Sequence, residues 1–328
     1  MTKASANNGS PAHLPAACGM PWILPFAIGS TVIVFASAFV GIRVGLRGYS
    51  PVHLAVLRFT TASALFAIRA LLVGIHIPER RHRPLIFLTG LLGFTIYALL
   101  VNFGETRVRA GMASFVVNMV PVFTVILAVL FLGERMRPLG WAGLAVSMSG
   151  AALLAYGTTS RLAFEPYVLV LVFAAIVQAV YFALQKPLLD RYGGVAVTSW
   201  TVWAGTLCLL PFLPSAVRLA FATPAPATFA AIYLGVLPTV VGYTAWGWVV
   251  SKMPVGRATT FLYFVPVVAT IIGWLVLHER PTFLGLLGGM IAISGVALVN
   301  LRARPVRTQN VTSSIRSGSK LKQADAVN

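Results

Sequence analysis

The sequence contains a succession of long apolar stretches separated by short loops that hold many of its charges. Two of these loops read PERRHRP, at residues 78–84, and GERMRP, at residues 133–138. A helix needs roughly 20 mostly apolar residues to cross the hydrocarbon of a bilayer. Ten stretches of the chain meet that requirement, and they cover residues 22–46, 51–74, 84–104, 109–132, 138–157, 166–185, 194–215, 227–250, 255–277 and 282–301.

The composition agrees with a membrane protein built from helices. Of the 328 residues 58% are hydrophobic and 10% are charged, whereas soluble chains carry about 25% charged residues. A membrane β-barrel would show segments of roughly ten residues in which apolar and polar side chains alternate, and these stretches do not alternate. The sequence therefore predicts an all-α membrane protein with ten transmembrane helices.

The chain is duplicated internally. At an offset of 145 residues, 121–153 aligns with 266–298 without a gap and is identical at 14 of 33 positions. The informative matches are proline, glycine and a Glu-Arg pair, because leucines coincide by chance in any membrane protein. Each half holds five predicted spans, so the second half must enter the membrane from the opposite side. Such inverted repeats are typical of alternating-access carriers, whose substrate site lies near the midplane where the halves meet.

Several short motifs stand out, and the proline, Glu-Arg and glycine motifs among them have a weaker second copy in the second half. They are Leu57-Arg58-Phe59, Pro121 followed by FLGER at 131–135, the glycines from Gly140 to Gly150, and a second copy in Pro266, HER at 278–280 and the glycines from Gly285 to Gly295. With these motifs the chain resembles the EamA-type ten-span members of the drug/metabolite transporter superfamily over residues 22–301. It departs from them at His278, where the family usually has glycine, and at Arg43, where many members carry lysine. The resemblance implies a secondary transporter that exports small organic metabolites such as amino acids.

The boundaries of the repeats and the charges predict how the chain sits in a cell. We expect a disordered leader (1–21), repeat 1 (22–157), a linker (158–165), repeat 2 (166–301) and a basic disordered tail (302–328). With the N-terminus inside, 17 of the 25 Lys and Arg residues fall on the inner side of the membrane. This bias predicts cytoplasmic termini in the plasma (inner) membrane. The net charge of +18 then indicates contact of the tail with anionic lipid, and we expect no nucleic-acid partner.

Polar and aromatic residues deep in the spans are the candidates for contact with a small-molecule substrate. Such side chains are costly in a bilayer unless they face protein or water, although any single one can serve helix packing alone. As a set they describe an aromatic, hydrogen-bonding site with little charge, suited to neutral or zwitterionic organic molecules. The candidates are Tyr97, Asn102, Asn118, Gln178, Tyr181, Tyr243, Trp246 and Tyr263.

Two prolines within the spans predict kinks. Pro121 and Pro266 cannot donate a helical hydrogen bond, which frees the carbonyls of Val117 and Leu262. In one hypothesis both kinks line the central cavity, and in the other they serve packing only. We also expect the Glu134–Arg135 and Glu279–Arg280 pairs, at span ends, to act as interfacial anchors and gate contacts.

The remaining charges leave alternatives open. Arg58 lies about two turns inside the second span, where it can snorkel to the outer interface, pair with Glu105 or hold a substrate carboxylate. No Asp or Glu lies in the middle of a predicted span. Because proton-coupled carriers commonly use a buried carboxylate or histidine, we expect a facilitator or exchanger driven by the substrate gradient. A proton-coupled effluxer is the alternative, and we expect neither a cofactor nor a metal.

Small residues predict close helix packing in the fifth and tenth spans. Gly140, Gly143, Ser147 and Gly150 recur at three- and four-residue spacings, and glycines at 285–295 do likewise. Such faces let backbones approach closely, either as a scaffold within a monomer or as the seam of a homodimer.

Two other classes of function compete with transport. An intramembrane enzyme would need a nucleophile, paired carboxylates or metal ligands within the spans, and the sequence offers no such motif. A structural or lipid-handling subunit would tolerate the repeat but would not require polar residues at the midplane. We therefore expect a carrier and no enzymatic activity.

Overall fold

The computed structural model describes residues 22–108, 110–131, 138–158, 166–277 and 283–300. Over these residues the chain is helical throughout and has no strand. The predicted leader, linker and tail lie outside the described residues, and so do Glu134, Arg135, Glu279 and Arg280.

The first half of the chain forms five helical rods, of which the third and fourth are interrupted. The elements are α1 (Ile23–Gly45), α2 (Pro51–Val73), η1 (Arg80–His82), α3 (Arg83–Gly90), η2 (Leu91–Ile96), α4 (Tyr97–Glu105), α5 (Ala110–Val117), α6 (Val120–Phe131) and α7 (Pro138–Thr158).

The second half repeats this plan. Its elements are α8 (Tyr167–Tyr192), α9 (Gly194–Leu209), η3 (Leu210–Phe212), α10 (Leu213–Ala222), α11 (Ala225–Leu234), η4 (Gly235–Gly242), α12 (Tyr243–Lys252), α13 (Val255–Thr260), η5 (Phe261–Tyr263), α14 (Phe264–Leu277) and α15 (Phe283–Asn300). In the described part of the chain these helices follow the predicted stretches, although the sixth and the seventh each run seven residues beyond the expected end. Among the described helices, six are long and apolar enough to cross a membrane, namely 23–45, 51–73, 80–105, 167–192, 194–222 and 225–252.

Capping residues set several of the helix ends. α2 begins after Ser50, whose hydroxyl accepts a hydrogen bond from the His53 amide, and Pro51 occupies its first position, where a missing N–H costs nothing. α2 and α8 end at Gly74 and Gly193, with φ of 78° and 79°. Glycine adopts this left-handed region without steric cost, so the chain can turn sharply into the next segment after each of these two helices.

Two pairs of interruptions fall at equivalent places in the two halves, whereas η3 has no counterpart in α2. η2 and η4 are both π-helical, and residues 91–96 correspond to 236–241 at the offset of 145. The turn at Asn118 and Met119, which separates α5 from α6, corresponds in the same way to the end of η5. π-Helical turns are rare and often mark functional sites. The duplication therefore extends from the sequence to the local irregularities of the backbone.

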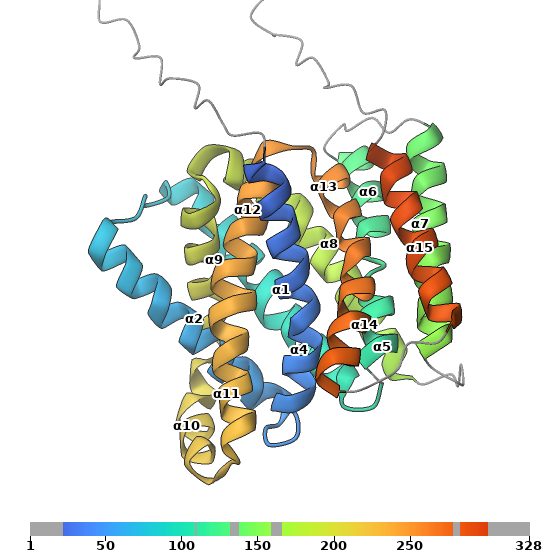
Figure 1. Ribbon diagram of the computed structural model, residues 1–328. Coiled ribbons are helices and arrows are strands. Elements are labelled where there is room, and N and C mark those ends of the chain that lie inside the picture. Colours follow the sequence, from blue (N-terminus) through green and yellow to red (C-terminus); the bar gives the residue numbers. More distant parts are fainter. Residues whose placement is uncertain (1–21, 109, 132–137, 159–165, 278–282, 301–328) are drawn as a thin grey trace, which may run out of the picture.

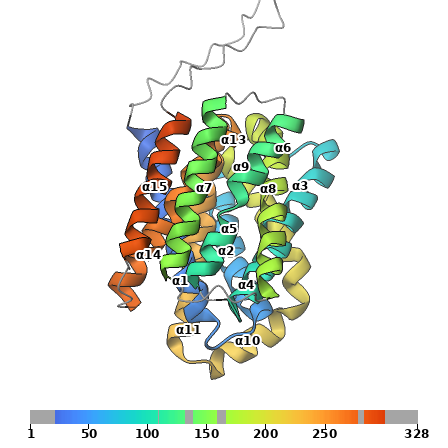
Figure 2. The same cartoon turned by 90° about the vertical axis from the view of Figure 1, so that its right-hand side faces the viewer.

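The helices pack as one bundle, with α7 and α15 side by side along one edge (Figures 1 and 2). A Cβ atom built on Gly295 of α15 would lie 2.3 Å from the backbone nitrogen of Ser147 in α7 and 2.6 Å from the Gly143 carbonyl oxygen. The predicted small-residue faces thus bring these two helices into backbone contact within one chain. This pair forms one edge of the bundle and packs against α5, α13 and α14.

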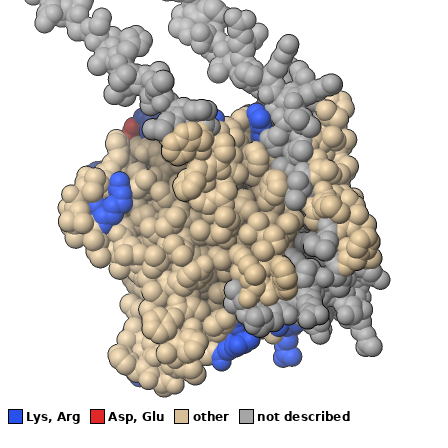
Figure 3. Space-filling model, viewed as in Figure 1, with Lys and Arg blue, Asp and Glu red and all other residues tan. Residues whose placement is uncertain are grey.

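Both ends of the described chain lie at the same end of the bundle. α1 begins there and α15 ends there (Figure 1), as a ten-span chain requires. On the face drawn in Figure 3, the Lys and Arg side chains lie toward the two ends of the bundle, and the broad surface between them is uncharged. This is the charge distribution that a surrounding bilayer demands, because the hydrocarbon does not solvate exposed charges.

Candidate binding cavity

A cavity lies between the two halves of the bundle. Its empty volume is about 690 Å³, including the space at its opening. Repeat 1 contributes wall residues from α1, α2, α4 and the region around the α5–α6 turn, while repeat 2 contributes them from α8, η4, α12, η5 and α14. The wall therefore includes three of the interruptions: η4, the α5–α6 turn and η5.

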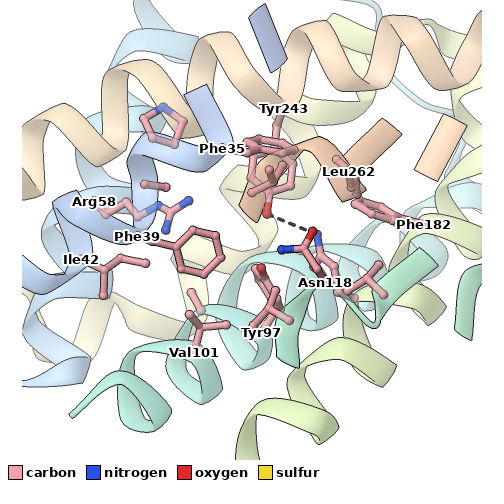
Figure 4. A pocket seen from close by; sticks show the side chains of 17 residues that line it. Phe35, Phe39, Ile42, Arg58, Tyr97, Val101, Asn118, Phe182, Tyr243 and Leu262 are labelled. Atoms are coloured by element: carbon pink, nitrogen blue, oxygen red, sulfur yellow. Dashed lines mark hydrogen bonds between the residues drawn. The ribbon is translucent and has the colours of Figure 1, made fainter. Parts of the chain in front are cut away.

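One wall of the cavity carries a buried cation. Arg58 of α2 is 6% exposed, and its Nε donates a hydrogen bond of 2.9 Å to Thr239 Oγ1 in η4. The Thr239 hydroxyl in turn donates to the Leu234 carbonyl, at 2.8 Å. Figure 4 shows the guanidinium beside Phe39, among the side chains that line the cavity.

Arg58 has no carboxylate partner within 4 Å in the described part of the chain. Two of the interpretations left open by the sequence, snorkelling to the interface and pairing with Glu105, therefore do not describe this conformation. The physical reason is the position of Arg58, which faces the interior of the bundle and reaches η4 rather than the outer end of α4. Its Nη groups are free to bind an anionic group inside the cavity.

Two amide side chains, Asn118 and Gln178, also line the cavity, and Figure 4 shows Asn118 across from Arg58. Asn118, at the α5–α6 turn, donates through Nδ2 to the Ser114 carbonyl. Gln178 of α8 donates through Nε2 to the Tyr243 hydroxyl at 3.3 Å, while its Oε1 has no protein partner among the described residues. The Gln178 carbonyl is therefore a vacant hydrogen-bond acceptor at the cavity wall.

Aromatic rings make up much of the rest of the wall. Phe35 and Phe39 come from α1, Tyr97 from α4, Phe182 from α8 and Tyr243 from α12. The rings of Phe35 and Tyr243 lie 5.1 Å apart between centroids, within the usual range for tilted aromatic pairs. Among the described residues, the cavity wall thus combines one cation, two amides and broad apolar surfaces, and it contains no Asp or Glu.

Four of the eight candidate residues from the sequence line the cavity, namely Tyr97, Asn118, Gln178 and Tyr243. The other four are buried but face neighbouring helices. Asn102 donates to the Pro51 carbonyl at 2.9 Å, and Tyr263 packs with Val125 and Leu144 in a separate apolar cluster.

Tyr181 and Trp246 form a second layer behind the cavity wall. Tyr181 packs edge-on against Phe94, with 5.6 Å between ring centroids. Trp246 lies 5.0 Å from Phe182, which does line the cavity. Helical periodicity alone could not separate the residues of the cavity wall from those of the second layer, because both groups contain aromatic residues with a polar atom on inward-facing helix surfaces.

The prolines lie next to the cavity without lining it. Pro121 is the second residue of α6 and Pro266 the third of α14, so both stand in the first turn of a new helix rather than in the middle of a continuous one. The break itself lies just before Pro121, at Asn118 and Met119. Residues on both sides of each break, such as Val117 and Leu262, do line the cavity.

The sequence analysis missed the contribution of α1 and of Pro238. Phe35, Phe39 and Ile42 are ordinary apolar residues of an apolar span, so no signal distinguished them from residues that face lipid. Pro238, inside η4, was a detectable signal, because a proline in a span marks an irregular backbone. Among the described residues, no group of three or more His, Cys, Asp or Glu is placed to hold a metal ion.

A duplicated bundle of apolar helices with a cavity between its halves is the architecture of a membrane transport protein. This chain belongs to the EamA-like transporter family, whose model matches it twice, over residues 21–156 and 165–301.

The chain is similar to curated relatives along most of its length. It is 44% identical to a probable terminal-alkyne amino-acid exporter of Streptantibioticus cattleyicolor, over 84% of this chain and 93% of the relative. It is 37% identical to an uncharacterized transporter of Bacillus subtilis, over 85% of this chain and 91% of the relative. It is 29% identical to a probable amino-acid metabolite efflux pump of Escherichia coli, over 81% and 90%.

A solved crystal structure shares the fold. It superposes with a TM-score of 0.69 at 18% sequence identity, covering 87% of this chain and 99% of the other. At that identity the likeness concerns the arrangement of helices alone.

Proposed function

We propose that this protein is a secondary transporter that exports amino acids with apolar side chains, or close relatives of them. The observation that carries the proposal is the buried guanidinium of Arg58 in a cavity with aromatic walls and no acidic lining. A carboxylate is the natural partner of a free guanidinium, and aromatic rings suit an apolar side chain. The names of two relatives, an amino-acid exporter and an amino-acid metabolite efflux pump, support the same class.

Each part of an amino acid has a matching group in the cavity. The substrate carboxylate binds the Nη groups of Arg58. The ammonium group binds the vacant Oε1 of Gln178, supported by Asn118. The side chain lies among Phe35, Phe39 and Phe182. The positive charge of Arg58 attracts a carboxylate and repels a cation, so the cavity favours a molecule with one carboxylate over a cationic drug.

Transport proceeds by alternating access of the cavity to the two sides of the membrane. The duplicated π segments and helix breaks give each half the same points of flexure, at the level of the cavity. A second arrangement, related to the first by a pseudo-two-fold axis in the membrane plane so that the halves exchange roles, would open the cavity to the other side. Transport rather than catalysis is the function proposed, and it rests on the family match.

The protein acts in the plasma (inner) membrane, with both termini on the cytoplasmic side. The excess of Lys and Arg in the tail and in the loops on that side supports this orientation. Repeat 1 (22–157) and repeat 2 (166–301) form the two moving units, joined by the linker between them.

The test is counterflow in proteoliposomes that contain the purified protein. We expect an internal excess of L-leucine or L-propargylglycine to drive uptake of labelled L-leucine, while L-arginine and the amide L-leucinamide do not. Arg58→Gln lowers uptake at least tenfold, because a charge-assisted bidentate contact is lost, and Arg58→Lys restores part of it. Arg218→Gln, on the exposed surface of α10, is the matched control and leaves uptake unchanged.

Each outcome bears on the assignment. If L-leucinamide, which lacks the carboxylate, shows the same counterflow as L-leucine, then Arg58 does not recognise the substrate carboxylate. Absence of counterflow with every amino acid of a full panel would contradict the proposed function.

A further inference from the structure

Thr239 of η4 holds the guanidinium of Arg58 from behind the cavity wall. The threonine is fully buried and is not one of the residues that line the cavity. Its Oγ1 accepts the hydrogen bond of 2.9 Å from Arg58 Nε and donates one of 2.8 Å to the Leu234 carbonyl. One hydroxyl thus links the buried cation of repeat 1 to the backbone of repeat 2.

Pro238 makes the Leu234 carbonyl available to this hydroxyl. In a regular α-helix the amide of residue 238 would donate to that carbonyl, but proline has no N–H group. Pro238 lies inside the π-helical η4, and the hydroxyl of the next residue, Thr239, supplies a donor. Because the single hydroxyl proton points at Leu234, the lone pairs of Oγ1 are left to face Arg58.

A second contact fixes the other side of the guanidinium. Arg58 Cζ lies 5.1 Å from the centroid of the Phe59 ring, within the range of a cation–π contact. Phe59 is buried and packs edge-on against Phe94, with 5.8 Å between ring centroids. With Nε held by Thr239, the edge of the guanidinium that carries both Nη groups remains for a carboxylate, which can bind it through two parallel hydrogen bonds.

The equivalent place in the other half lacks this pair of side chains. A Cβ atom on Gly235 would lie 2.5 Å from the Arg58 carbonyl oxygen, and one on Gly90 would lie 2.4 Å from the Thr201 carbonyl oxygen. The two glycines are equivalent at the offset of 145, so Thr201 stands where the arginine stands in repeat 1. Phe94, at the position equivalent to the threonine of η4, has no polar side-chain atom. The backbone contact belongs to the repeated scaffold, whereas the arginine and its threonine partner are an addition to it.

We propose that Thr239 is a positioning residue that orients Arg58 for end-on binding of the substrate carboxylate. The inference rests on the proposed function and deepens it, because it names the geometry of the contact. Both Nη groups bind the carboxylate while Nε stays with Thr239. The hydroxyl fixes the guanidinium before the substrate arrives, and such preorganisation lowers the entropic cost of binding. Loss of the hydroxyl therefore weakens substrate binding although Thr239 never touches the substrate.

The first experiment measures the kinetics of L-leucine counterflow in proteoliposomes. Thr239→Val keeps the shape of the side chain and removes the hydroxyl. We expect it to raise the KM for L-leucine about fivefold, which corresponds to the net contribution of one hydrogen bond. Vmax stays within about twofold of its original value, because the lost interaction serves binding. Thr239→Ser keeps the hydroxyl and the original KM.

The matched control is Thr89→Val in α3. Thr89 is also fully buried, and its hydroxyl donates to the carbonyls of Leu85 and Ile86 within the same helix. This variant keeps the KM of the unmodified protein. A KM in Thr239→Val equal to that of Thr89→Val would overturn the proposal, and so would equal KM values in Thr239→Val and Thr239→Ser.

Pro238→Ala tests the same arrangement from the side of the backbone. The new amide N–H can donate to the Leu234 carbonyl in a regular helical turn, which releases the proton of the Thr239 hydroxyl. We expect the KM for L-leucine to rise although Thr239 itself is unchanged. This variant leaves all the groups of the threonine in place, so it also decides the matter if Thr239→Val does not fold. An unchanged KM in Pro238→Ala contradicts the proposal.

The second experiment needs no substrate. A proton–nitrogen NMR spectrum of the detergent-solubilised protein, made with isotope-labelled arginine, contains a cross-peak from the Nε–H group of Arg58, which Arg58→Gln removes. Thr239→Val shifts this cross-peak, and Thr239→Ser leaves it close to its original position. An unshifted cross-peak in Thr239→Val overturns the positioning contact. Absence of L-leucine counterflow in the unmodified protein is a different result, which contradicts the proposed function and leaves the NMR spectrum to decide whether Thr239 orients Arg58.

Discussion

At the scale of single residues, the bundle depends on glycines where two backbones meet. A Cβ atom on Gly90 of α3 would lie 2.4 Å from the Thr201 carbonyl oxygen and 2.7 Å from the Ala204 Cβ of α9. The nearest obstacle is backbone, which cannot rotate away. Gly90→Ala therefore forces α3 and α9 apart.

We expect Gly90→Ala to destabilise the protein by about 1–3 kcal/mol, the usual cost of overpacking. The measurement is the melting temperature of the detergent-solubilised protein. Gly29→Ala in α1 is the control, because no atom lies within 4 Å of its added Cβ, and its melting temperature stays the same or rises. Equal melting of the two variants would contradict the close approach of α3 and α9.

At the scale of helical elements, the breaks beside the cavity are the points where the halves can flex. Pro121 has no amide N–H, so α5 and α6 cannot join into one regular helix across it. Pro121→Ala supplies the missing donor and allows a continuous, stiffer helix. We expect this variant to bind L-leucine normally but to exchange it several-fold more slowly in counterflow.

Pro214→Ala is the control for this prediction. Pro214 also stands at the second position of a helix, α10, but α10 contributes nothing to the cavity wall. Its substitution leaves the exchange rate unchanged. If Pro121→Ala exchanges L-leucine as fast as Pro214→Ala, the α5–α6 turn is a packing feature and not a hinge.

Much of this architecture could be predicted from the sequence because apolar length and internal repetition are strong signals. The apolar stretches predicted the helices, and the glycine spacing predicted close packing faces on α7 and α15, but not that these two helices pack against each other. The π segments could not be predicted, since nothing in LLGFTI at 91–96 differs in composition from an ordinary helix. The cavity was predicted only through its polar members, because the orientation of an apolar residue such as Phe39 depends on tertiary packing.

The partners of the charged residues Arg58 and Glu105 could not be predicted from the sequence either. The sequence marked Arg58 as an unusual charge and left pairing with Glu105 as one of three alternatives for it. The structure turns Arg58 into the cavity, toward Thr239 of η4, and leaves Glu105 buried without a hydrogen bond in the described part of the chain. Which partner a charge meets depends on the rotation of each helix, and a π turn changes that rotation within a single span.

At the scale of the whole molecule, the arrangement of the two halves makes a prediction about orientation. α1 begins and α15 ends at one end of the bundle, and α10 lies at the other (Figure 1). The cations at the first end include Arg80, Arg81, Arg83, Lys186, Arg191 and Lys252, whereas the other end carries Arg43, Arg47, Arg107 and Arg218. Positively charged loops stay in the cytoplasm, so the end that holds the termini faces inward.

Cysteine labelling tests this orientation in a background where Cys18 and Cys208 are replaced by alanine. We expect a membrane-impermeant maleimide to label Arg218→Cys in intact cells, and to label Arg81→Cys only after the cells are permeabilised. Labelling of both variants in permeabilised cells is the control for reactivity, since both side chains are exposed. The reverse labelling pattern would mean that the end of the bundle that holds the termini faces outward. Labelling of both variants in intact cells would place positions 81 and 218 on the same side of the membrane, which contradicts their positions at opposite ends of the bundle.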